Sequence, residues 1–131
     1  MIPKAILFLL VFVVGIFWTG AGAGRYIDAR FEVYALATSA IQSGVTPEKL
    51  YREALAAYYA GEYVWAEAMF DAITERAPVS LKSDLDFWRG ECFFRLGRTE
   101  RARQFFEAFL AQEPEGPRVE LAKQRTSLLR E

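Results

Sequence analysis

The sequence predicts an all-α protein, in which a single transmembrane helix precedes a short solenoid of helix-turn-helix units. Three observations lead to this prediction. They are an apolar run near the N-terminus, an amphipathic stretch with helical spacing after it, and an internal repeat in the remainder. We divide the chain accordingly into residues 1–24, residues 25–45 and residues 46–131.

Residues 5–24 form an apolar run of twenty residues without a charged side chain. A helix of that length spans about 30 Å, which is the hydrocarbon thickness of a bilayer. We therefore predict a transmembrane anchor that contacts membrane lipid through residues 5–24, with Trp18 in the aromatic belt at its exit side. The stretch Ala21-Gly22-Ala23 also resembles a signal-peptidase site, so a cleaved signal peptide is the competing interpretation.

The residues around the anchor predict its orientation and its packing. A very short tail before such a run is typical of a tail that stays in the cytoplasm. The rest of the chain would then be extracytoplasmic, and periplasmic in a bacterium. Gly20 and Gly24 are four residues apart, as are Gly15 and Thr19. Small residues at this spacing let membrane helices approach closely, so we expect these glycines to pack against other spans.

Between the anchor and the repeats, apolar residues recur every three to four positions, as one face of an amphipathic helix requires. They are Ile27, Phe31, Tyr34, Ala37 and Ile41. Such a helix extends the transmembrane helix or packs under the first repeat, and glycine at position 44 would end it.

The remainder contains an internal repeat, because residues 58–78 align without a gap with residues 94–114, at an offset of 36. The aligned pairs keep their glycine, alanine, phenylalanine or proline: Gly61 with Gly97, Ala66 with Ala102, Phe70 with Phe106, and Pro78 with Pro114. Glycine ends a helix in the left-handed conformation, alanine allows close helix contact, phenylalanine fills the seam, and proline stops a helix. Each unit is therefore predicted to be a helix, a tight turn and a second helix.

These positions resemble the tetratricopeptide repeat, a family of 34-residue helix-turn-helix units. The second unit, residues 83 to about 116, carries the pattern at six positions: Gly90, Phe93, Gly97, Ala102, Phe106 and Pro114. The first unit, residues 46 to about 82, has Ala54 and Ala57 at the places of Gly90 and Phe93. The resemblance implies a helical solenoid.

Capping residues place the helices. Thr46 with Pro47 begins a first helix that runs to about residue 60, and the second covers about residues 63–76. Ser83 with Asp86 is a partial capping box, which predicts a third helix from there to about residue 96. The fourth is expected over residues 99–112, and a terminal capping helix within residues 117–131 begins near Pro117.

The resemblance also implies a binding surface, since the first helix of each unit lines a concave groove in this family. Helix register would place eight residues there: Tyr51, Leu55, Tyr58, Tyr59, Phe87, Glu91, Phe94 and Arg95. Exposed aromatic residues of this kind anchor peptides or helices of a partner. The competing interpretation is that several of them pack the thin core of a two-repeat domain.

The composition excludes several classes of function. The chain has 16 basic and 17 acidic residues, which gives no electrostatic basis for binding nucleic acid. It has no histidine and one cysteine, which removes imidazole chemistry, most zinc sites and an intrachain disulfide. We expect Cys92 to be a buried hydrophobe. With no nucleophile-base pair or phosphate-binding loop either, we predict a protein that is not an enzyme, with no catalytic residue, metal or cofactor.

Arginines gather in the second unit and allow two interpretations. They are Arg89, Arg95, Arg98, Arg101 and Arg103. They form either a patch for an acidic partner or lipid head groups, or ordinary helix faces whose charges pair within and between repeats.

The expected function is that of a non-catalytic, membrane-anchored scaffold, an accessory subunit whose partners are protein subunits of a larger membrane complex. The alternative is a secreted or tethered adaptor that binds peptides, a chaperone-like helper in export or assembly. The two differ in whether residues 1–24 are retained and in whether partners are stoichiometric or transient.

Overall fold

A computed structural model of the chain describes residues 27–130, and all of their regular secondary structure is helical. Residues 27–42 form a helix that we call the leading helix. Five more follow: α2 (Pro47–Tyr59), α3 (Tyr63–Thr74), α4 (Val79–Arg95), α5 (Thr99–Gln112) and α6 (Pro117–Leu129). The predicted anchor lies outside the described residues, as do Gly15, Gly20 and Gly24. Among residues 27–130, no helix is both long enough and apolar enough to cross a bilayer.

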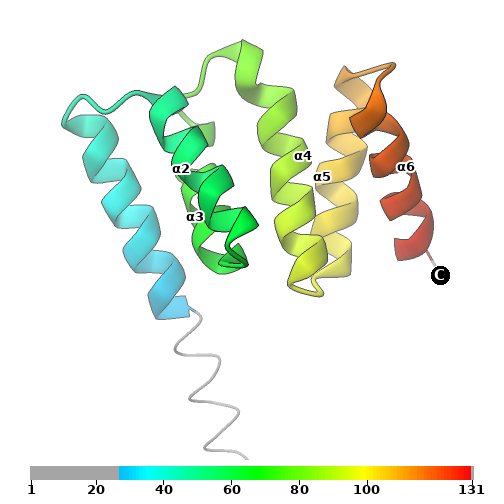
Figure 1. The fold of residues 1–131 in the computed structure, drawn as a ribbon, viewed down its shortest axis with the longest axis horizontal. Coiled ribbons are helices and arrows are strands. Elements are labelled where there is room, and N and C mark those ends of the chain that lie inside the picture. Colours follow the sequence, from blue (N-terminus) through cyan, green and yellow to red (C-terminus); the bar gives the residue numbers. More distant parts are fainter. Residues whose placement is uncertain (1–26, 131) are drawn as a thin grey trace, which may run out of the picture.

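The helices stand side by side in a row, with the leading helix at one end and α6 at the other (Figure 1). Each labelled helix packs against the next one in sequence, and α4 also contacts α6. In Figure 1, α2 lies in front of α3 and α4 lies in front of α5. This is the solenoid of helix pairs that the repeat predicts.

The two tight turns within the units depend on glycine. Gly61 has φ +82° and Gly97 has φ +73°, a backbone conformation in which other residues are strained. The chain then closes each helix end with a hydrogen bond from the following residue. The amide of Glu62 donates to the carbonyl of Ala57 at 2.9 Å, and that of Arg98 donates to Phe93 at 2.9 Å.

The core lies along the seam between the helices of each pair. The alanines and phenylalanines shared by the two units, at positions 66, 102, 70 and 106, are fully buried. Gly90 lies against the Phe106 ring, where an added Cβ would come within 2.8 Å of a ring carbon. The close approach of α4 and α5 therefore requires glycine at this position.

The helix bounds agree with the capping signals except at the start of α4. Thr46 caps α2 as predicted, accepting a hydrogen bond from the amide of Lys49 at 3.3 Å. The prediction that the third helix starts after Ser83 is wrong, because α4 already begins at Val79, directly after Pro78. Proline lacks an amide hydrogen and its φ of −62° leads into the helix, so Pro78 both follows α3 and opens α4. The Ser83 hydroxyl instead donates to the Glu113 carboxylate at 2.9 Å.

The leading helix packs against the first repeat, as one of the two alternatives for these residues expected. Its buried face agrees with the predicted one only toward the end of the helix, where Ala37 is buried and Ile41 packs on the core. Val33 and Ala37 are buried, whereas Ile27 and Phe31 are exposed. Arg30 lies on the same side of the helix as Val33, because Glu67 and Asp71 of α3 provide negative charges there. Its Nε lies 2.8 Å from a Glu67 carboxylate oxygen, and Nη2 lies 2.5 Å from Asp71.

Helix α6 continues the repeat as well as covering the end of the domain. Arg118 pairs with Asp84 of α4, and Arg125 pairs with Glu91 of α4. Both contacts join residues that are 34 positions apart, so α6 runs parallel to α4 in constant register. It therefore stands where the first helix of a third unit would stand.

Candidate functional site

A groove of about 340 Å³ lies between the first helices of the units. α2, α4 and α6 contribute most of its lining, and the start of α3 contributes Tyr63. The constant spacing of the units positions these side chains, because equivalent faces of α2, α4 and α6 turn to the same side. Its lining residues are Tyr58, Tyr59, Tyr63, Phe87, Trp88, Glu91, Arg95, Leu121 and Arg125.

A carboxylate at the centre of this groove holds three helices together. The Tyr58 hydroxyl of α2 donates to Glu91 at 2.9 Å, and Arg125 of α6 donates from Nε to the other Glu91 oxygen at 3.0 Å. Burial, reinforced by the hydrogen bond to Glu91 and its charge, raises the pKa of Tyr58 to about 12. Tyr58 is thus a neutral donor at physiological pH, and the lining around Glu91 is pre-organised.

Aromatic rings form the wall of the groove next to this carboxylate. The Tyr58 ring makes edge contacts with Tyr59 at 5.3 Å, Tyr63 at 5.3 Å and Trp88 at 5.1 Å between centroids. Tyr59 also contacts Trp88 at 5.8 Å, yet it is 73% exposed. Tyr59 is therefore a large aromatic side chain held in place by its neighbours and open to a partner.

Arginines complete the groove. Arg95 lies at its rim, next to the hydroxyl of Tyr58, and is exposed. The Arg125 guanidinium lies 4.2 Å from the centroid of the Phe94 ring, while its nitrogens face Glu91. The arrangement offers aromatic surface and guanidinium donors, which suits an apolar side chain beside a carbonyl or carboxylate acceptor.

Five of the eight residues predicted for this surface line the groove: Tyr58, Tyr59, Phe87, Glu91 and Arg95. The other three do not. Tyr51 packs its ring against Phe70 with centroids 5.9 Å apart, Leu55 packs on the core, and Phe94 is partly covered by Arg125. The core-packing interpretation describes these three positions and also Tyr58 and Phe87, which are 8% and 2% exposed and belong to the hydrophobic core. The binding role of the predicted residues remains a prediction.

The sequence interpretation missed Tyr63, Trp88, Leu121 and Arg125. A signal for the last two was present, because Leu121 and Arg125 follow Phe87 and Glu91 by the 34-residue period of the family. The prediction of a terminal capping helix within residues 117–131 did not make use of this 34-residue spacing. Trp88 gave no such signal, because it follows Phe87 by one position and therefore lies on a different part of the helix surface from the residues that the register selected.

The five arginines of the second unit do not form one patch. Arg89 is buried between α3 and α5, where it pairs with Glu67 and Asp71 and lies 4.3 Å from the Phe105 ring centroid. Arg103 pairs with Glu100 and Glu107, and Arg101 lies over the Phe93 ring. For Arg89 and Arg103, the interpretation as charges paired within and between repeats holds.

Cys92 is fully buried, as predicted. Burial raises the pKa of its thiol, and the charges of Glu67 and Glu91 raise it further. The side chain is thus an unreactive thiol rather than a nucleophile. Within residues 27–130, no cluster of three or more cysteine or acidic side chains is arranged to hold a metal ion.

A family model described as tetratricopeptide repeat matches residues 51–117, which is just over half of the chain. The match begins within α2 and ends at the first residue of α6, so it spans both helix pairs. Comparison with curated proteins and with solved structures gives no significant match.

Proposed function

The chain belongs to the tetratricopeptide repeat family, and on that premise we propose that it is a membrane-anchored scaffold without catalytic activity. It serves as an accessory subunit that mediates contacts between proteins within a larger membrane complex. The observation that carries the proposal is the groove between α2, α4 and α6, with Tyr59 exposed on a rigid aromatic wall.

The groove supports partner binding because its contact residues are already ordered. Tyr59 rests against Tyr58 and Trp88, so little side-chain freedom is lost when a partner covers it. Arg95 lies at the same rim and can donate to an acceptor beside the buried apolar group. Tyrosine and arginine, the residue types at positions 59 and 95, are enriched among the interface residues that contribute most to binding energy.

The apolar segment supports the membrane part of the proposal. Residues 5–24 have the length and composition of a single span and lie directly before the leading helix. The leading helix is joined to α3 through Arg30, Glu67 and Asp71. A span at this position would hold the repeats near the membrane surface, where they meet the soluble faces of neighbouring subunits.

The groove is tested by replacing its two most accessible residues in the full chain, Tyr59→Ala with Arg95→Ala. The protein is purified in mild detergent from its native membranes, and stoichiometric partners are identified by mass. We expect the double variant to lose its partners while circular dichroism shows unchanged helicity. Leu128→Ala removes an exposed apolar side chain of α6 outside the groove lining and should keep them. Partners that stay with the double variant would show that the groove is not the contact.

The anchor is tested separately by extracting membranes with carbonate and measuring the intact mass of the mature chain. We expect a full-length chain that remains in the membrane fraction. A mature chain beginning at Gly24 in the soluble fraction would replace the scaffold with the secreted peptide-binding adaptor. A detergent-purified monomer with no co-purifying subunit would refute the role in a complex.

A further inference from the structure

We propose that an open trough along the leading helix is a second docking site, which takes a basic amphipathic helix of a partner protein. The proposal rests on the scaffold function but uses a different surface from the groove of α2, α4 and α6. Two adjoining hollows of about 250 and 310 Å³ form the trough, and they share Val33 and Trp65.

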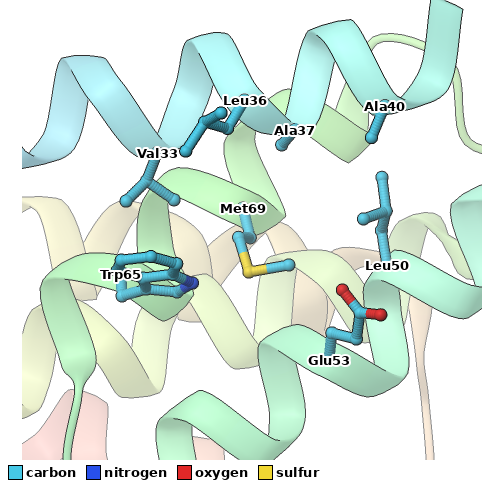
Figure 2. A pocket seen from close by; sticks show the side chains of 8 residues that line it. All are labelled: Val33, Leu36, Ala37, Ala40, Leu50, Glu53, Trp65 and Met69. Carbon is cyan, nitrogen blue, oxygen red and sulfur yellow. The ribbon is translucent and has the colours of Figure 1, made fainter. Parts of the chain in front are cut away.

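Apolar side chains from three helices meet in the first of these hollows. Val33, Ala37 and Ala40 point from the leading helix toward Met69 of α3 and Leu50 of α2 (Figure 2). Leu36 and Trp65 border the same hollow and are 64% and 45% exposed. Large apolar side chains gathered at one hollow in this way mark an interaction surface.

The position of the leading helix indicates that the occupant is a helix. Arg30 contacts Asp71, and Tyr34 contacts Glu75, in both cases 41 residues ahead. The leading helix therefore runs parallel to α3, in the position of the second helix of a preceding unit. In the two units that follow, such a helix packs against a first helix, as α3 does against α2. Among residues 27–130, the leading helix has no first helix of its own, and its Leu36 side chain stays 64% exposed beside the hollow.

The charges that line the trough indicate which charge the partner helix carries. Its two charged lining residues are both acidic, Glu53 from α2 and Glu62 from the turn before α3. A helix with lysine or arginine beside its apolar stripe matches both carboxylates. A second copy paired about a two-fold axis would instead bring these carboxylates toward like charges. Residues 5–24 carry no charged side chain and would match neither of them.

Binding of designed helical peptides to the full chain in nanodiscs of neutral phosphatidylcholine tests the proposal. Each peptide has 18 residues, a leucine stripe, and lysine, glutamine or glutamate beside the stripe. By fluorescence anisotropy, we expect the lysine peptide to bind at least tenfold more tightly than the glutamate peptide. The double charge reversal Glu53→Lys with Glu62→Lys should invert this order, which a merely structural role of the trough would not do.

Two further variants separate the trough from the groove. Leu36→Asp changes an exposed side chain, so the fold should persist, and the lysine peptide should bind at least tenfold more weakly. Val79→Asp, on the exposed first residue of α4, and the groove variant Tyr59→Ala should both leave peptide binding unchanged. No binding, equal binding of the lysine and glutamate peptides, or a dimer that Leu36→Asp dissociates would overturn the proposal. None of these results bears on the groove test, whose readout is the native partner.

Discussion

Glu67 is an acidic side chain at the junction of three helices, and its replacement by alanine is a direct test of how the leading helix is held. The Glu67 side chain is 1% exposed and meets Arg30 of the leading helix at 2.8 Å and Arg89 of α4 at 3.3 Å. Asp71 contacts the same two arginines but is 28% exposed. Removing the Glu67 carboxylate leaves Arg89 buried with Asp71 as its remaining anionic partner in the described part of the chain.

The expected loss follows from this geometry. Removing one member of a buried ion pair costs about 3 to 5 kcal/mol of folding free energy, because the other charge stays buried. Asp71 still neutralises part of that charge, so we expect Glu67→Ala to cost about 3 kcal/mol. For a domain of this size, this corresponds to a fall of about 12 °C in the unfolding temperature. Asp71→Ala removes a more exposed partner and should cost about 1 kcal/mol.

Thermal unfolding of the full chain in mild detergent, followed by circular dichroism, measures both variants under the same conditions. Glu67→Gln keeps the volume and one acceptor oxygen, so it should fall between the wild type and Glu67→Ala. Glu67→Leu combined with Arg89→Leu removes both buried charges and should recover much of the stability. Equal losses for Glu67→Ala and Asp71→Ala, or a loss below about 1 kcal/mol for Glu67→Ala, would refute the reasoning.

Three further predictions concern single residues. Thr46→Ala removes the acceptor for the Lys49 amide, and urea unfolding should show a loss of about 1 kcal/mol. The raised pKa of Tyr58 implies that its stabilising contribution is complete below about pH 10 and is lost as the pH rises through about 12. Tyr58→Phe, which cannot ionise, should weaken this loss of stability with rising pH, and an unchanged profile would contradict the assignment to Tyr58. Cys92 should resist a thiol reagent in the native state and react in urea, so fast labelling of the folded chain would show that Cys92 is accessible.

The elements bounded by glycine, proline and a polar cap could be predicted from the sequence, since these residues act through local backbone conformation. α5 and α6 show this, with the expected starts at Thr99 and Pro117. The start of α4 could not be placed in this way, because Pro78 serves as a stop for one helix and an opening for the next. The capping signal at Ser83 was plausible locally, but tertiary packing gives its hydroxyl to Glu113.

The face of the leading helix and the third wall of the groove depend on residues distant in sequence. Arg30 counts as a surface residue in any periodicity argument, yet Glu67 and Asp71 pair with it on the side of the helix where Val33 and Ala37 are buried. The contact of Arg125 with Glu91 fixes the register of α6 to α4, which the 34-residue spacing of these two residues already indicated. The local sequence pattern therefore predicts where helices begin and end, whereas side-chain contacts with other units influence which face of each helix is buried.

The parallel arrangement of the leading helix and α3 has a mechanical consequence. A pull along the leading helix acts in the same direction on its contact with Asp71 and on its contact with Glu75, because both join residues 41 positions apart. These contacts are loaded together in shear instead of being peeled apart one after another. Tension that enters at residue 27 is thus carried into α3, and Arg89 passes it on to α4 through Glu67. A displacement of the leading helix along its axis would therefore move the repeats with it, because the two are joined by side-chain contacts and not by a flexible linker.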